Sequence, residues 1–208
     1  MVLNVKNTQK LLGKSRLSGA IEKIPSMAIR NQAEKELEKL LKENDLSNRM
    51  LTKHLRESIL PAIAVYGILL DHGWTVKDAY QLVRRTVLEA SKPVAASFQR
   101  LGKLPFCFPL LRMMCPLSIQ VNFGEAGWDF VWKENNRSKL EWHCHRCFYA
   151  DVFARYHMPE LTAIFCESDD VVYGNISGVR WGRTKTIGYG DDICDFRFYN
   201  DRSQGMSE

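Results

Sequence analysis

The sequence predicts an α+β fold, in which a helical N-terminal half packs on an antiparallel sheet of about four strands. The spacing of apolar residues is the main reason. Up to about residue 115 they recur at helical intervals, and beyond it they alternate with polar residues as in strands. The chain has 208 residues, 45% hydrophobic and 25% charged, which suits an ordinary globular protein.

Two helices are predicted at the start of the helical half. Ser26 precedes the first, and its hydroxyl can accept a hydrogen bond from an amide of the first turn. The second would begin after the cap Ser47 and end at Gly73. Its residues 59–70 are apolar on nearly all sides, which indicates a central position. Pro61 should kink this helix, because proline has no N–H to donate.

A third helix is predicted after Thr75, which resembles a capping box together with Asp78. Pro93, Gly102 and Pro105 should then divide the chain into short pieces, because proline and glycine interrupt regular structure.

The second half begins with three predicted strands. Residues 117–123 and 128–134 each alternate between apolar and polar, and the tetrapeptide at 124–127 between them is typical of a tight hairpin. A turn at 134–138 leads to the third strand, residues 139–147.

The chain is expected to end with further helix and strand. Residues 148–174 have the pattern of one or two helices broken near Pro159, and residues 178–200 that of a strand, a glycine-rich turn and a strand. In the last strand Cys194 lies on the face of two phenylalanines, and Asp195 lies on the other face.

The positive charge is concentrated at the N-terminus. The net charge of the chain is +5, and residues 1–30 contain the whole excess, with six basic residues and one acidic residue. The rest is neutral overall, which argues against a nucleic-acid-binding face. We expect residues 1–24 to form a basic segment that is dispensable for catalysis. Residues 25–208 would form one α+β domain, helical over 25–115 and containing the sheet over 116–200.

The composition also predicts the compartment. There is no run of about 18 apolar residues that could span a membrane, and the N-terminus lacks the apolar core of a secretory signal. We therefore expect a cytoplasmic protein that binds no membrane. Six cysteines in a reducing compartment favour catalytic or metal-binding roles over disulfides. Whether the chain forms a homo-oligomer is left open.

The cysteines permit a metal site. Cys144 and Cys147 form a C-x-x-C pair that Cys166 and Cys194 could complete to four thiolates around zinc. A second closely spaced pair is missing, however, and the first two cysteines point to opposite faces of a strand. We therefore expect no cofactor, with structural zinc as the alternative.

The cysteines also permit thiol catalysis. Cys147 lies where a strand gives way to a helix, and a helix N-terminus stabilises a thiolate. Cys166 and Asp169 share one helix face. Because a carboxylate raises the pKa of a nearby thiol, Asp169 suits a proton carrier or a contact for a substrate amine better than an activator. The planar guanidinium of Arg183 suits a substrate carboxylate, or else an ion pair with Asp169, Asp170 or Asp195.

A structural role is the competing interpretation for each cysteine, because a free cysteine usually behaves as a small buried hydrophobic residue. Cys107 and Cys115 lie in an apolar stretch and are expected in the core.

Two stretches of the chain resemble the L-2-amino-thiazoline-4-carboxylic acid hydrolase family. They are LPAIAVYGILLDHG with the following KDAYQLV, and RCFYADVFARYHMPELTAIFCESDD with the following RTKTIGYGDDICDFRF. The resemblance covers roughly residues 61–198. Family members often have glycine before the P-E-L element, where this chain has His157. The recurring motif positions fall on Cys147, Cys166, Asp169, Arg183, Thr184, Gly190, Cys194, Asp195 and Phe196.

The resemblance implies a hydrolase that acts on a C–N bond of a small cyclic amidine or amide, such as 2-amino-thiazoline-4-carboxylate, and leads toward cysteine or a related amino acid. The partner would be a small-molecule carboxylate substrate. The catalytic candidates are Cys166, Asp169, Cys147 and Cys194, and the substrate-binding candidates are Arg183, Thr184, Asp195 and Gly190.

The mechanism can be drawn in two ways. A cysteine can attack the substrate, with Cys166 first in rank, then Cys147, then Cys194. Alternatively Asp169 or Asp195 can activate a water molecule. Outside enzymes, the clustered cysteines would suit a metal-binding or small-ligand-binding protein.

Overall fold

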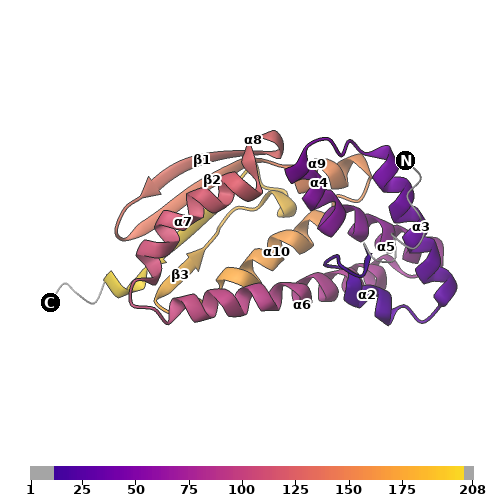
Figure 1. Cartoon of the computed structure of the whole chain (residues 1–208), viewed down its shortest axis with the longest axis horizontal. Coiled ribbons are helices and arrows are strands. Elements are labelled where there is room, and N and C mark those ends of the chain that lie inside the picture. The colour runs from indigo at the N-terminus through magenta and orange to yellow at the C-terminus, as the bar shows by residue number, and fades with distance from the viewer. Residues whose placement is uncertain (1–11, 204–208) are drawn as a thin grey trace. The chain divides into compact units, whose positions relative to one another are not determined.

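The computed structural model describes residues 12–203, and the chain divides into two compact units. Unit 1 comprises Met1–Ala90 and Val152–Ile164, and unit 2 comprises Ser91–Asp151 and Phe165–Glu208. Figure 1 labels the elements along the chain. The α+β prediction is confirmed: helices make up the N-terminal half, and a four-stranded antiparallel sheet lies in the C-terminal half.

Unit 1 is helical. Its helices lying wholly within the unit are α2 (Ser18–Lys23), α3 (Met27–Glu43), α4 (Arg49–His54) and α5 (Leu60–Asp71). The central position predicted for α5 is confirmed, because residues on all of its sides are buried, among them Tyr66 and Leu69. The hydroxyl of Tyr66 donates a hydrogen bond to Glu160 at 2.9 Å, which ties the returning segment 152–164 to this helix.

The chain adapts to Pro61 by changing its helical pitch. A π-helical turn, Leu55–Ile59, joins α4 to α5 immediately before the proline. In an α-helix the carbonyl of Glu57 would accept from residue 61, which has no N–H. That carbonyl instead accepts from the backbone N–H of Arg16 at 2.9 Å. The missing donor is thus replaced from a distant part of the chain.

The described part of the basic segment packs into unit 1. Leu17, Ala20 and Ile24 are fully buried. Residues 1–11, with part of the charge excess, lie outside the described residues. The boundary after residue 24 and the dispensability of residues 1–24 for catalysis stay predictions, because packing bears on stability and not on turnover.

The helix caps agree with the sequence in two of three cases. The Ser26 hydroxyl accepts from the Ile29 N–H at 3.5 Å. The Thr75 hydroxyl donates to Asp78 at 2.7 Å, and the Asp78 N–H donates to it at 3.1 Å. Ser47 was the wrong cap for α4. The cap is Asn48, which forms caps equally well and whose carbonyl oxygen accepts two backbone N–H groups.

The predicted interruption at Pro93 is also wrong, because tertiary packing outweighs the local cost of proline in a helix, about 3 kcal/mol. Helix α6 (Val76–Gly102) continues through Pro93, and α7 (Cys107–Asn122) continues through Pro116. Residues 117–123 therefore do not form a strand, and all but the last belong to α7. The tetrapeptide at 124–127 is the short helix α8 (Gly124–Gly127) and not a hairpin.

The sheet of unit 2 has the strand order β1-β2-β4-β3, and every neighbouring pair is antiparallel. The strands are β1 (Trp128–Asn135), β2 (Lys139–Cys147), β3 (Val179–Gly182) and β4 (Cys194–Asn200). The predicted turn before β2 is confirmed, because the side chain of Asn136 accepts from the backbone of Ser138 and Lys139.

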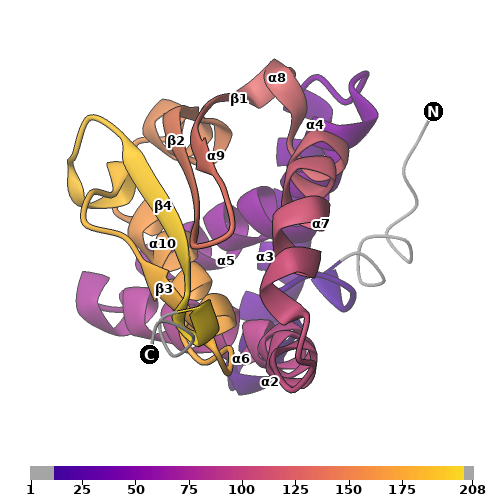
Figure 2. The same cartoon turned by 90° about the vertical axis from the view of Figure 1, so that its left-hand side faces the viewer.

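Helix α7 lies along one face of this sheet, as both Figures 1 and 2 show. Its residues Cys107, Phe108 and Leu111 form a core with side chains of β2, β3 and β4, including Trp142 and Phe198. Cys107 is 1% exposed, which confirms its predicted place in the core.

Two further helices each begin in one unit and end in the other. They are α9 (Phe148–Arg155) and α10 (Leu161–Tyr173), and they confirm the helices predicted on either side of Pro159. No helix within residues 12–203 has both the length and the apolar composition needed to cross a membrane.

A charged network crosses the central strands. Glu141 of β2 pairs with Lys139 at 2.5 Å and with Arg197 of β4 at 3.2 Å, and it contacts His143 at 2.9 Å. Burial by itself would raise the pKa of Glu141, but the hydrogen bonds from Lys139, His143 and Arg197 outweigh burial and lower this pKa to about 2.

The segment between α9 and α10 holds a non-glycine residue in the left-handed conformation. His157 has a φ of 57°, in the left-handed region. Its N–H donates to the Ala154 carbonyl at 3.0 Å, and the Met158 N–H donates to the Phe153 carbonyl at 2.9 Å. These two bonds form a Schellman motif, which usually places glycine at this position. Gly73 ends α5 in the same way, with a φ of 79°.

The first prediction concerns His157. His157→Gly should raise the free energy of unfolding by about 0.5–1 kcal/mol, because the left-handed conformation costs a residue with a Cβ but not glycine. The matched variant Gly73→His should lower it by about 1 kcal/mol for the same reason. Urea unfolding of both variants measures the two values. A loss of stability in His157→Gly would show that the histidine side chain makes a stabilising contact.

Candidate active site

Four free thiols gather in unit 2 where three elements meet. Cys144 and Cys147 lie near the end of β2, Cys166 lies on α10, and Cys194 begins β4. The strand register places Cys144 directly opposite Cys194. Cys144, Cys166 and Cys194 are buried and Cys147 is half-buried.

The side chains of Cys166 and Cys194 interact with each other. A hydrogen bond between their side chains raises the pKa of Cys166, and burial and the nearby Asp169 raise it further. The same bond lowers the pKa of Cys194 and outweighs the effect of burial. The backbone N–H of Ile187 donates to the Cys194 sulfur at 3.3 Å, and the charge of Arg183 also favours its thiolate. The interaction between the two side chains therefore favours the neutral form of Cys166 and the thiolate form of Cys194.

Cys147 lies at the N-terminus of α9, as the sequence indicated, but its thiolate is not favoured. Burial raises the pKa of Cys147 to about 11. Hydrogen bonds from the backbone of Ala150 and Tyr149, in the first turn of α9, lower the pKa only in part. Desolvation thus outweighs the helix N-terminus. Cys147 is still close enough to interact electrostatically with Cys194 and Asp169.

Cys144 behaves as a core thiol. Its sulfur donates to the carbonyl of Arg146 at 3.0 Å, and burial raises its pKa.

Arg183 joins the thiols to two aspartates. Its side chain is 4% exposed, and it pairs with Asp170 at 2.7 Å and with Asp169 at 3.5 Å. It also donates to the carbonyl of Cys166 at 3.0 Å. The structure therefore contains the ion pair that the sequence left as the alternative for Arg183. A guanidinium has five N–H donors, so these three contacts leave donors for a further acceptor.

Asp195 fixes the loop that leads into β4. One carboxylate oxygen accepts from the N–H groups of Thr184 at 2.8 Å and Lys185 at 2.6 Å. The other accepts from the Thr184 hydroxyl at 2.5 Å and pairs with Arg197 at 2.8 Å. Burial would raise the pKa of Asp195, but these contacts lower it. With all four acceptor positions used, the geometry favours a positioning role for Asp195 over activation of water.

Gly190 shapes the same loop through its backbone. Its φ is 97°, and it ends a 3₁₀ turn, Ile187–Tyr189. The carboxylate of Asp191 accepts from the Thr186 N–H at 2.7 Å and holds the turn closed. The turn positions the Ile187 N–H at Cys194. This backbone donor was missed from the sequence, because an N–H group has no residue signature. The glycine-rich T-I-G-Y-G stretch was the available signal.

Within residues 12–203, no group of three or more His, Cys, Asp or Glu side chains is arranged to hold a metal ion.

The fold and these contacts define an α+β protein with a candidate thiol active site. The family model described as L-2-amino-thiazoline-4-carboxylic acid hydrolase matches residues 53–198, and the chain belongs to this family. The match confirms the resemblance noted in the sequence, and its name places the chain among hydrolases. No curated protein and no solved structure matches the chain significantly.

The second prediction tests the loop anchor. Asp195→Asn should lower the free energy of unfolding by about 3 kcal/mol at pH 7, because it removes the buried partner of Arg197. Asp192→Asn removes an exposed partner of Lys185 and should leave the free energy of unfolding nearly unchanged, because solvent screens exposed ion pairs. Urea unfolding compares the two variants.

The pH dependence adds a check. Because the pKa of Asp195 is lowered from 3.8 in the folded protein, its contribution is present above pH 3.8 and is lost as the pH falls through the folded value. The difference between wild type and Asp195→Asn should therefore shrink in acid. A difference that stays constant with pH would contradict an ionised Asp195.

Proposed function

We propose that this protein is a cysteine-dependent hydrolase that opens a small cyclic amidine or amide bearing a carboxylate, such as 2-amino-thiazoline-4-carboxylate. Family membership supports the hydrolysis. The observation that carries the cysteine dependence is the contact between the side chains of Cys166 and Cys194, together with the Ile187 N–H that donates to the Cys194 sulfur at 3.3 Å. A buried thiol with a lowered pKa beside a protonated thiol is a nucleophile paired with a proton donor.

Cys194 is the nucleophile in this proposal, although the sequence ranked it last among the three candidates. Its strand face is apolar, which suggested a core role. The contacts from Ile187, Arg183 and Cys166 favour its thiolate, whereas Cys166 and Cys147 both have raised pKa values. Only the thiolate of a cysteine is strongly nucleophilic, so the order of the candidates reverses.

The first step forms the bond between the Cys194 sulfur and C2 of the amidinium substrate. The bond from C2 to the ring nitrogen then breaks, and its electron pair goes to that nitrogen. Cys166 gives the leaving nitrogen its proton and becomes a thiolate. A leaving nitrogen needs such a proton, which is why a neutral thiol beside the nucleophile supports C–N cleavage.

The second step uses water. The Cys166 thiolate takes a proton from a water molecule as its oxygen attacks C2. The C2–sulfur bond then breaks, and its electron pair returns to Cys194 as the thiolate. Both thiols end the cycle in the protonation state in which they began, and the net change is the addition of one water to the substrate.

The charged residues suit the two ends of such a substrate. The carboxylate of Asp169, 37% exposed, can bind the amidinium nitrogen atoms. The remaining N–H donors of Arg183 can bind the substrate carboxylate. Thr184, Asp195 and Gly190 serve in this proposal by holding the loop that presents Ile187 to Cys194. For the non-enzymatic alternative, no contact among the described residues offers specific support.

The third prediction separates the thiols. Cys194→Ala should lower kcat for 2-amino-thiazoline-4-carboxylate by about a thousandfold or more, because the nucleophile is lost. Cys166→Ser should retain part of the activity. Its pH–rate profile should shift to higher pH, because the bond that lowers the pKa of Cys194 is weakened. Cys144→Ser is the control: it alters a buried thiol, so it should lose stability and keep its turnover. Substrate loss and urea unfolding are measured together.

Near-normal turnover by Cys194→Ala in a folded protein would contradict the assignment, and Cys166 would become the nucleophile. Loss of turnover in Cys144→Ser without loss of stability would contradict the separation between core and catalytic thiols.

The fourth prediction concerns the broken bond. Cleavage of the C–N bond leaves the substrate sulfur attached to C2, so a thiol reagent should detect no new thiol while mass spectrometry detects the added water. A new thiol formed at the rate of substrate loss would identify C–S cleavage. That result would correct the bond and leave the hydrolase assignment intact.

A further inference from the structure

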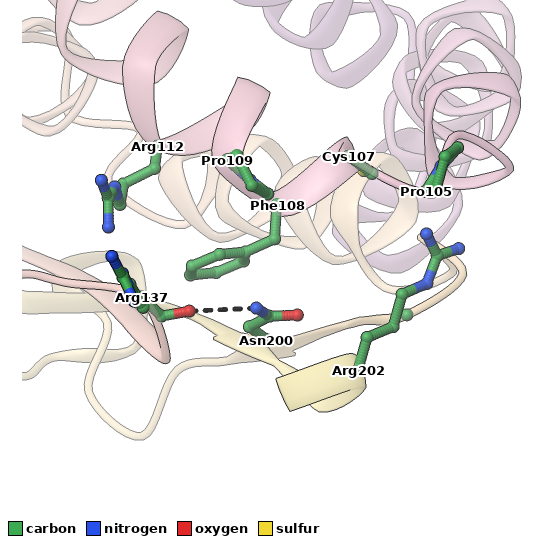
Figure 3. Close-up of a pocket in the computed structure, with 9 residues that line it drawn as sticks. Pro105, Cys107, Phe108, Pro109, Arg112, Arg137, Asn200 and Arg202 are labelled. Atoms are coloured by element: carbon green, nitrogen blue, oxygen red, sulfur yellow. Dashed lines mark hydrogen bonds between the residues drawn. The ribbon is translucent and has the colours of Figure 1, made fainter. Parts of the chain in front are cut away.

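A separate cavity lies at the far end of β4 from the thiols. Its volume is about 450 Å³, within the range of small-molecule sites. Its lining includes Phe108, Pro109, Arg112, Arg137, Asn200 and Arg202 (Figure 3). Asn200 ends the strand that Cys194 begins, so the cavity is about 20 Å from the thiols at the usual rise per strand residue.

The lining of the cavity is positively charged. It contains three arginines and no carboxylate. Figure 3 shows the side chains of Arg112, on α7, and Arg137, in the turn between β1 and β2, pointing toward each other. Within residues 12–203, neither forms an ion pair with a carboxylate. Nearby acids are engaged elsewhere: Asp201 pairs with Arg180 at 3.4 Å.

The other polar groups of the cavity are held in place. Arg202 donates to the backbone carbonyls of Leu104 at 2.5 Å and Gly102 at 2.6 Å. Gly178 leaves room for Arg202, because a Cβ there would lie 2.2 Å from the arginine Nε. The side-chain amide of Asn200 donates to the Arg137 carbonyl at 3.0 Å. The base of the cavity is therefore built by hydrogen bonds that leave the guanidinium groups of Arg112 and Arg137 for a ligand.

Two facing guanidinium groups repel each other, and an anion between them removes the repulsion. A phosphate monoester has a charge near −2 at neutral pH and can accept from two arginine forks, whereas a monocarboxylate neutralises only one. The apolar wall formed by Phe108 and Pro109 suits a ring. We propose that this cavity binds a small phosphate monoester that carries a ring or a short apolar group.

The fifth prediction tests this site with phenyl phosphate, titrated calorimetrically into the full chain at low ionic strength. Wild type should bind it, and Arg112→Gln and Arg137→Gln should each weaken binding by about tenfold or more, because each removes one charged fork. Arg146→Gln is the matched control, since it removes an exposed arginine that pairs with Asp151 outside the cavity, and it should bind like wild type. Cys194→Ser should also bind like wild type.

Benzoate tests whether the anionic group or the ring of the ligand determines binding. It offers the same ring with one charge and should bind at least about tenfold more weakly than phenyl phosphate. Equal binding of benzoate would overturn the choice of a phosphate ligand. Equal weakening by Arg146→Gln would identify nonspecific attraction to surface charge, and loss of binding in Cys194→Ser would place the ligand at the thiols. Either result would overturn the site. Because binding is measured directly, the test is independent of the proposed hydrolase activity.

Discussion

The buried carboxylate of Asp195 is the contact on which the candidate site depends. It lies on β4, next to Cys194, and it accepts hydrogen bonds from the backbone and side chain of Thr184 and from the Lys185 N–H. Through these bonds the loop after β3 is held against the start of β4. The same loop carries the Ile187 N–H that reaches the Cys194 sulfur. Arg197 then connects Asp195 to Glu141 on β2, so the site is anchored to the middle of the sheet.

The thiols illustrate how burial and hydrogen bonding compete. Removal from water raises the pKa of every cysteine in the group, because it disfavours the charged form. Only Cys194 has enough compensating contacts to reverse that effect. The Cys166 side chain, the Ile187 N–H and the charge of Arg183 all act on one sulfur, so they lower the pKa of Cys194 while the pKa values of the other three thiols are raised. This selectivity is what makes a reaction with one nucleophile reasonable in a cluster of four similar side chains.

The strands of the sheet and the helix α7 show where the spacing of apolar residues predicts secondary structure and where it does not. β2 and β4 were predictable because each has one face in the core with Trp142 or Phe198, and alternation follows from that burial. α7 was mistaken for a strand in its second half because it is apolar on both sides. Leu117 and Val121 are 60% and 76% exposed, while the other side of the helix packs on the sheet. An apolar residue on the solvent side removes the contrast from which a helical period is recognised.

The sequence by itself determined the fold class, the family, most element boundaries and the positions of the functional candidates. Motif spacing and local patterning depend only on the order of residues along the chain, so they can be recognised without the structure. The tertiary structure alone decided that Cys166 and Cys194 lie together and that Arg183 pairs with the aspartates of α10. Cys166 and Cys194 are distant in sequence, and the pKa of each depends on atoms a few ångströms away in space. No pattern of residue types specifies those distances, because they arise only when α10 and β4 are packed together.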